Sequence, residues 1–159
     1  MKIIVSWIGL NKDFKAGEVA KDSPNYLLHR MKQYDYDKHI VLYNKADHDV
    51  HALRFQNKIS KEFKGRIVEL KEIKLQDERD LNELQNKVGS FVKSLEKEDM
   101  TILLSTGTSI SKIAWYIFAI SYQQSIRLIQ YRANHEDFSE VTVEKSLATN
   151  GRFHPVWTA

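Results

Sequence analysis

TILLSTGTSISKIAWYIFAISY, residues 101–122, passes from a strand through a tight turn into a helix. Thr101–Leu104 is apolar after the threonine, which is typical of a strand in the middle of a parallel sheet. The turn Ser105–Ser109 follows, and Ile110–Tyr122 is apolar nearly all round. A helix of that composition packs against a sheet or lies at a subunit interface. This unit therefore predicts an α/β fold.

The alternation of strand and helix continues on both sides of this unit. The other predicted strands are Lys2–Ile8, His39–Tyr43, Arg66–Leu70, Ser125–Tyr131 and a short Val141–Val143. Three further helices are predicted. The first begins at Ser23-Pro24, the second runs from Ala46-Asp47 to Lys64-Gly65, and the third begins at Asp77, which is its expected cap. Strands that alternate with helices predict one domain with a mainly parallel sheet.

Composition sets the broad class of protein. The chain has 159 residues, enough for one domain, with 42% hydrophobic and 28% charged residues, the balance of a globular protein. The absence of cysteine excludes disulfides, thiolate metal sites and cysteine nucleophiles. The longest apolar run, Ile113–Ile120, is too short for a membrane span, and no signal peptide is predicted, so a cytoplasmic location is the default expectation. The net charge of +3 is compatible with a nucleotide partner without requiring one.

Two loops are the predicted ligand site, because ligands of open parallel sheets bind at the carboxyl ends of the strands. One loop is Trp7–Asn11 and the other is Ser105–Ser109. In the second, Gly107 permits close approach to the backbone, and the first amides of the following helix have no internal partner and attract anions. The residues that could hold a phosphate there are Thr106, Gly107, Thr108, Ser109 and Lys112. The simpler alternative is that Thr108 or Ser109 only caps the helix.

Other candidate residues carry weaker signals. Tyr131 and Arg132 end the fifth strand and could stack on a base and meet a phosphate. His48 and His51 could share one face of a helix and hold a metal, but such a pair is more typical of a solvated helix start. Trp115 and Tyr116 are expected in the core or at a dimer interface; the alternative is that a base stacks on them. No P-loop, no G-x-G-x-x-G and no G-x-S-x-G motif is present, and no cofactor is predicted.

Three motifs together resemble the CARF domain, the CRISPR-associated Rossmann fold. They are Ile4-Val-Ser-Trp-Ile-Gly9, Leu103-Leu-Ser-Thr-Gly-Thr-Ser109 leading into Ile113-Ala-Trp115, and Arg127-Leu-Ile-Gln130. The chain is most similar to the version found in RtcR-type regulators of RNA repair, over residues 3 to about 144. The most specific element is the S-T-G-T turn followed at a fixed distance by Trp115.

The resemblance implies a Rossmann-like three-layer α/β/α domain with a six-stranded, mainly parallel sheet, which forms a homodimer. It implies that a cyclic oligoadenylate lies across the twofold axis, over the first loop (Gly9, Leu10 and Asn11) and the second (Thr106, Gly107, Thr108 and Ser109, with Lys112 nearby). RtcR-type relatives are thought to respond to damaged RNA ends and to restrain a fused AAA+ transcription-activating module. This sequence does not include such a module, so it is expected to be either a sensory fragment or a stand-alone sensor. Residues 1–144 are expected to form the sensing domain and residues 145–159 a tail or a linker to an effector.

The function expected from these observations is a regulatory sensor for an RNA-derived ligand. The ligand would be a cyclic oligoadenylate or an RNA end with a 2′,3′-cyclic phosphate, and the output a transcriptional or CRISPR effector. An alternative is a metal-independent ring nuclease, which would be slow because neither loop contains a histidine to act as a base. A third is a dimerisation module with a vestigial pocket. The sensor and the ring nuclease both require main-chain amides beside Gly9 and Gly107 that are open to an anion.

Overall fold

The computed structural model describes residues 1–121 and 126–143, except for the side chains of residues 10–11 and 45–48. Its main sheet has six strands: β1 (Lys2–Trp7), β4 (Lys38–Tyr43), β5 (Val68–Glu72), β6 (Asp99–Leu103), β7 (Ile126–Arg132) and β8 (Asp137–Val141). Their order is β5-β4-β1-β6-β7-β8, and only β8 runs antiparallel to its neighbour. The predicted six-stranded, mainly parallel sheet is confirmed.

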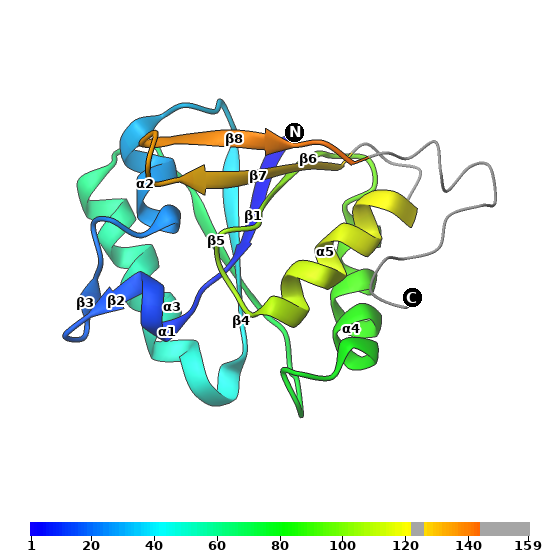
Figure 1. Ribbon diagram of the computed structural model, residues 1–159. Helices are drawn as coiled ribbons and strands as arrows, with labels where there is room; N and C mark the ends of the chain where they lie inside the picture. Colours follow the sequence, from blue (N-terminus) through cyan, green and yellow to red (C-terminus); the bar gives the residue numbers. More distant parts are fainter. Residues whose placement is uncertain (122–125, 144–159) are drawn as a thin grey trace.

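Helices cover both faces of the sheet, as Figure 1 shows. The helices are α2 (Pro24–Met31), α3 (Lys45–Glu62), α4 (Leu81–Ser94) and α5 (Ser109–Ser121). Alternate residues of β1 separate the two cores: Ile3 and Val5 pack with α4 and α5, whereas Ile4 packs with α2. The period-2 alternation of a strand buried on both sides therefore builds the three layers. None of the helices in the described part of the chain is long and apolar enough to cross a membrane.

Most boundaries differ from the predicted ones by one or two residues, and three differences are larger or concern the site. The polar stretch from Asn11 to Asp22 contains the one-turn helix α1 (Leu10–Asp13) and the hairpin β2 (Phe14–Lys15) and β3 (Glu18–Val19). The sixth strand ends at Val141 rather than beginning there, because its register on β7 starts at Asp137. Asp80, not Asp77, caps α4: its carboxylate accepts hydrogen bonds from the main-chain N–H groups of Asn82 and Glu83.

The predicted start of α2 is confirmed in detail. Ser23 Oγ accepts a hydrogen bond from the Tyr26 amide at 3.3 Å, and Pro24 occupies the first turn, where its missing N–H costs nothing. The expected tail or linker, residues 145–159, lies outside the described residues.

Candidate functional site

The two predicted loops lie side by side at the point where the strand order reverses. β1 pairs with β4 on one side and with β6 on the other. The chain first builds the half of the sheet that holds β4 and β5 and then crosses to β6, so the strand order reverses between β1 and β6. The loops that leave these two strands line one pocket of about 340 Å³. Its lining residues are Trp7, Ile8, Gly9, Lys12, Asp13, Asn44, Leu75, Glu78, Leu84, Gly107, Thr108 and Ser111.

Gly107 is what allows the loops to approach so closely. Its φ is +88°, a conformation that favours glycine. A Cβ atom at this position would lie 2.6 Å from Ser111 Oγ and 3.1 Å from Trp7 Cβ. The glycine is therefore required both by the turn and by the contact with the end of β1.

The N-terminus of α5 opens beside this turn. Thr108 caps it: its Oγ1 accepts from the Ser111 amide at 3.1 Å, and its carbonyl accepts from Ser111 Oγ at 2.7 Å. The capping interpretation is thus correct for Thr108. Within residues 1–121 and 126–143, no hydrogen bond engages the main-chain N–H groups of Ser109 and Ile110, so these amides can meet an anion.

Two lysines lie near the two loops, Lys12 on α1 after the first loop and Lys112 on α5 after the second. Lys12 lines the pocket and also an adjoining hollow of about 350 Å³, which Lys112 and Tyr131 line as well. Lys12 Nζ lies 3.4 Å from the Ser105 carbonyl, to which it donates across the two loops. Partial burial, and then the charge of Lys12, lower the pKa of Lys112. A bound anion would stabilise the charged form of Lys112.

The first loop departs from expectation at Gly9. Its amide donates to Asp13 Oδ2 at 2.8 Å, so a buried carboxylate already occupies the N–H that was expected to face a ligand. Asp13 Oδ1 accepts a further hydrogen bond from Asn25 Nδ2 at 3.1 Å. Burial raises the pKa of Asp13 from 3.8 to about 6 in spite of these donors. The prediction of an open Gly9 amide is therefore wrong, and the free donors belong to the second loop.

Behind Asp13, a chain of buried hydrogen bonds crosses the layer between the sheet and α2. The chain joins Asn25 Oδ1 to Ser6 Oγ at 2.5 Å, Ser6 Oγ to His39 Nε2 at 2.7 Å, His39 Nδ1 to His29 Nε2 at 2.9 Å, and His29 Nδ1 to Tyr36 Oη at 3.0 Å. Every member is less than one-tenth exposed. The first loop is thus anchored to the interior of the domain.

The direction of these hydrogen bonds follows from the Asp13 end. Asn25 Nδ2 donates to Asp13 and to a main-chain carbonyl, so Asn25 Oδ1 accepts and Ser6 donates to it. Ser6 Oγ then accepts from His39, whose Nδ1 accepts from His29. Burial lowers the pKa of His29 to about 3 and that of His39 well below its ordinary range, so each ring carries the single proton that this arrangement needs.

The third and fourth loops of the pocket were not predicted from the sequence. Asn44 follows β4, and Leu75 and Glu78 follow β5. Asn44 Nδ2 donates to the Leu75 carbonyl at 3.4 Å and to Glu78 Oε1 at 3.3 Å. The rule that selected the first two loops, that ligands bind where parallel strands end, applies equally to these strands and was the available signal.

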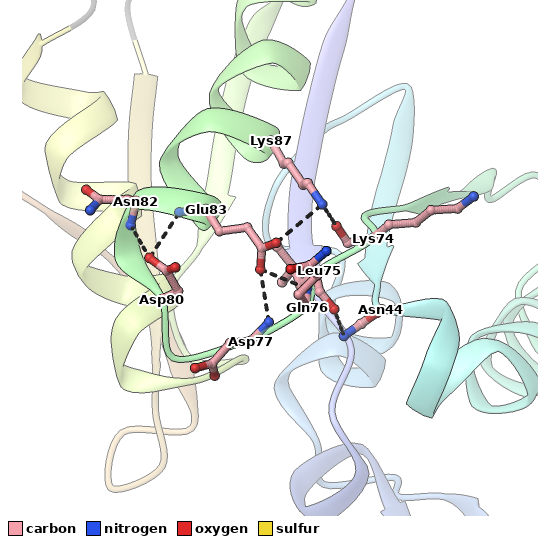
Figure 2. A network of polar contacts seen from close by, with 9 residues as sticks. All are labelled: Asn44, Lys74, Leu75, Gln76, Asp77, Asp80, Asn82, Glu83 and Lys87. Carbon is pink, nitrogen blue, oxygen red and sulfur yellow. Dashed lines mark hydrogen bonds and ion pairs between the residues drawn. The ribbon is translucent and has the colours of Figure 1, made fainter.

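The loop after β5 is held to α4 by the network in Figure 2. Glu83 Oε1 accepts from the amides of Gln76 and Asp77, and Lys87 Nζ donates to the Lys74 carbonyl. A carboxylate that receives two main-chain donors fixes the loop against the helix. This wall of the pocket is therefore formed before any ligand arrives.

The remaining predicted residues are dispersed. Thr106 is buried and outside the pocket lining, and Ser109 is exposed at the first turn of α5. Arg132 forms two hydrogen bonds with Asp137, at 2.9 and 2.7 Å, so its guanidinium is already paired. Leu10 and Asn11 begin α1, and their side chains lie outside the described part.

The structure also shows where the two histidines considered for a metal site and Trp115 lie. His51 packs edge-on against Phe14, with ring centroids 4.8 Å apart, and the side chain of His48 is outside the described part. The described residues contain no group of three or more His, Asp or Glu side chains that could hold a metal ion. Trp115 is fully buried against Phe118, in agreement with the core interpretation.

Solved structures of low sequence identity share this fold. Csm6 of Enterococcus italicus, solved with cyclic hexa-2′-fluoro-hexa-dAMP bound, has a TM-score of 0.70 at 12% identity, over 94% of this chain and 43% of that one. Protein VC1899 of Vibrio cholerae has a TM-score of 0.66 at 14% identity, over 90% of this chain and 34% of that one. Can2 of Sulfobacillus thermosulfidooxidans, solved with cyclic tetra-adenylate, has a TM-score of 0.57 at 12% identity, over 87% of this chain and 34% of that one.

These likenesses establish the fold alone, a Rossmann-like α/β fold with a mainly parallel sheet. The chain spans less than half the length of each of these structures. No curated protein matches its sequence. A family model described as "HFX_2341_N:-like, N-terminal" matches residues 25–137, most of the described domain, and the chain belongs to this family.

Proposed function

We propose that residues 1–144 form a ligand-sensing domain that binds an RNA-derived ligand at this pocket, either a cyclic oligoadenylate or an RNA end with a 2′,3′-cyclic phosphate. The observation that carries the proposal is the meeting of the first and second loops in one pocket, with the α5 N-terminus and two lysines beside it. Two proteins of the same fold were solved with a cyclic adenylate ligand or its analogue, which supports the choice of ligand.

The site is suited to a polyanion that is larger than a single phosphate. Lys12 lines both the pocket and the hollow, so the two lie next to each other with a cation at their common edge. Tyr116 and Tyr131 line the hollow and offer aromatic surface for a base. Phosphates at Lys12 and Lys112, with bases to either side, would fill both parts.

The proposed active form is a homodimer with the ligand across its axis. Three half-buried isoleucines of α5 belong to none of the core clusters: Ile113, Ile117 and Ile120. A helix that is apolar on its outer side as well as its inner side is suited to a subunit interface. Because the same helix begins at the pocket, two such helices would present two N-termini to one ligand.

The regulatory output is the remaining part of the proposal. In the full system, residues 145–159 would connect the domain to a transcriptional or CRISPR effector, and a closer relation to RtcR-type RNA-repair regulators would favour the transcriptional one. Ring cleavage is the alternative activity. Ser109 is exposed at the first turn of α5 and Lys112 follows three residues later, so both could stabilise charge during cleavage.

Titration calorimetry tests the binding. The wild-type chain is titrated with cyclic tri-, tetra- and hexaadenylate and with an RNA that ends in a 2′,3′-cyclic phosphate. We expect one of them to bind at micromolar or lower concentration. Lys112→Gln should weaken that binding about tenfold or more, since a charge-assisted hydrogen bond contributes roughly 1.5–3 kcal/mol. Lys97→Gln, an exposed lysine that precedes β6 and so lies at the opposite end of that strand from the pocket, is the control.

Failure of all four ligands to bind would refute the proposal. Incubation of the bound ring with protein and EDTA then separates sensing from cleavage. A ring that stays intact for hours supports a sensor, and linear products support the nuclease.

A further inference from the structure

We infer that Gln33 protects an edge of the sheet: its side-chain amide occupies the place of a further strand beside β8 and keeps a second copy of this chain from pairing there. The inference is independent of the proposed function, because it concerns the edge at β8 and not the pocket.

β8 presents main-chain hydrogen-bonding groups on its outer side. It is the last strand of the sheet, with β7 as its neighbour on one side only, as Figure 1 shows. Tyr131, the register partner of Phe138, donates its amide away from β8, to Ser105 Oγ at 2.7 Å. Tyr131 and Phe138 are therefore a non-hydrogen-bonded pair, in which the main-chain groups of both residues point away from each other. The N–H and C=O groups of Phe138, and those of Glu140 two residues further on, thus face outward.

The Gln33 side chain meets Phe138 as a neighbouring strand would. Its Nε2 donates to the Phe138 carbonyl at 2.7 Å, and its Oε1 accepts from the Phe138 amide at 2.8 Å. One side-chain amide thus supplies both the donor and the acceptor that a residue of a paired strand supplies. Strand addition at this point requires that Gln33 be displaced.

The loop that carries Gln33 is held beside β8 by the residues that follow it. Tyr34 packs edge-on against Phe138, with ring centroids 6.3 Å apart. Tyr36 is buried, and its Oη lies 3.0 Å from His29 Nδ1 in the hydrogen-bond chain described above. The contact of Gln33 with β8 is therefore built into the fold and does not depend on a freely moving side chain.

The segment behind this contact is of a kind that pairs with copies of itself. It reads Phe138-Ser-Glu-Val-Thr-Val143, with no proline, no glycine and a single charge. Six-residue segments of high β-propensity and low charge associate when their edge is open. A second copy of this chain is therefore the occupant that Gln33 excludes.

The opposite edge of the sheet provides a comparison. His39 N donates to the Ile67 carbonyl, so the next residue, Val68 of β5, turns its main-chain groups away from β4. Gln56 Nε2, from α3, donates to the Val68 carbonyl at 2.8 Å, so a glutamine covers this edge as well. β5 has the sequence VELKE, however, and its three charges oppose strand pairing by themselves. Loss of Gln56 should therefore be harmless for association, whereas loss of Gln33 should not.

Gel filtration with light scattering, over a range of protein concentrations, tests the inference. We expect the mass of Gln33→Ala to rise with concentration to at least about twice that of the wild-type chain, and the mass of the matched control Gln56→Ala to stay at the wild-type value. Glu140→Pro, added to Gln33→Ala, should restore the wild-type mass, because proline removes an outward N–H group without a loss of hydrogen bonds to β7. Hydrogen exchange measures the contact itself: the Phe138 amide should exchange at least about tenfold faster in Gln33→Ala.

Circular dichroism establishes that each variant is folded. A folded Gln33→Ala protein that keeps the wild-type mass at every concentration overturns the inference. Equal association of Gln56→Ala also overturns it, as does association that persists in the double variant, since β8 would then not be the surface involved. If Gln33→Ala does not fold, Gln33→Glu gives the same comparison: its carboxylate accepts from the Phe138 amide but cannot donate to the carbonyl.

Discussion

Asp13 shows how a single residue links the ligand loop to the protonation of the core. Its carboxylate binds the Gly9 amide and is fully buried, and burial raises its pKa from 3.8 to about 6. A group whose pKa is raised on folding contributes stability below about pH 4, and this contribution is lost as the pH rises through 6. His29 acts in the opposite sense: burial lowers its pKa to about 3, so its contribution is present above 6.5 and lost as the pH falls toward 3.

Asp13→Asn is therefore expected to steepen the pH dependence of stability near pH 5. At that pH the folded protein holds a proton on Asp13 that the unfolded chain releases, whereas His29 takes one up on unfolding. Removal of the Asp13 carboxyl should raise the slope of the unfolding free energy by about 1 kcal/mol per pH unit. Urea unfolding at pH 4.5, 5.0 and 5.5, followed by tryptophan fluorescence, measures this slope. Asp22→Asn, fully exposed and already ionised at pH 5, should leave it unchanged; equal slopes for both variants would contradict the assignment.

At the scale of the elements, the two glycine turns of the site have opposite tolerances. Gly107→Ala forces a side chain into a φ of +88° and to within 2.6 Å of Ser111 Oγ, whereas at Gly9 a Cβ atom would meet nothing within 4 Å and the backbone is extended. We expect Gly107→Ala to lower the unfolding free energy by about 1–3 kcal/mol and Gly9→Ala to change it by less than about 1 kcal/mol. Thermal or urea unfolding of the two variants measures the difference. Comparable losses would show that the loops do not meet as described.

The same scale shows what the sequence could predict. The main strands and the longer helices could be predicted from hydrophobic runs and turn residues. Each of these elements depends on the local spacing of its apolar residues and on the capping residues at its ends. The cap of α4 was placed three residues early because Asp77 and Asp80 are the same residue type; the spacing of Asp80 and Glu83, typical of a capping box, was the better signal. The hydrogen bond from the Gly9 amide to Asp13 could not be predicted, because Asp13 lies in the short helix α1. A helix of one turn inside a polar stretch has no periodic pattern of hydrophobic residues. The pairing of Asn44 with Glu78 depends on the order of strands in the sheet, which local patterns do not contain.

For the whole molecule, α5 joins the ligand site to assembly, since its N-terminus opens beside the pocket and its body carries apolar side chains outward. Ile113 and Ile117 lie one turn apart, and both are half-buried. We expect light scattering after gel filtration to give a dimer, and the double substitution Ile113→Glu and Ile117→Glu to give a monomer, because paired carboxylates would be buried at the interface. Val50→Glu is the control: Val50 is 53% exposed on α3, across the sheet, and should leave the dimer intact. If the ligand spans the twofold axis, the monomer should also lose at least tenfold in affinity, since each subunit then supplies half of the contacts. A monomer that binds as tightly as the dimer would show that one subunit is the complete site.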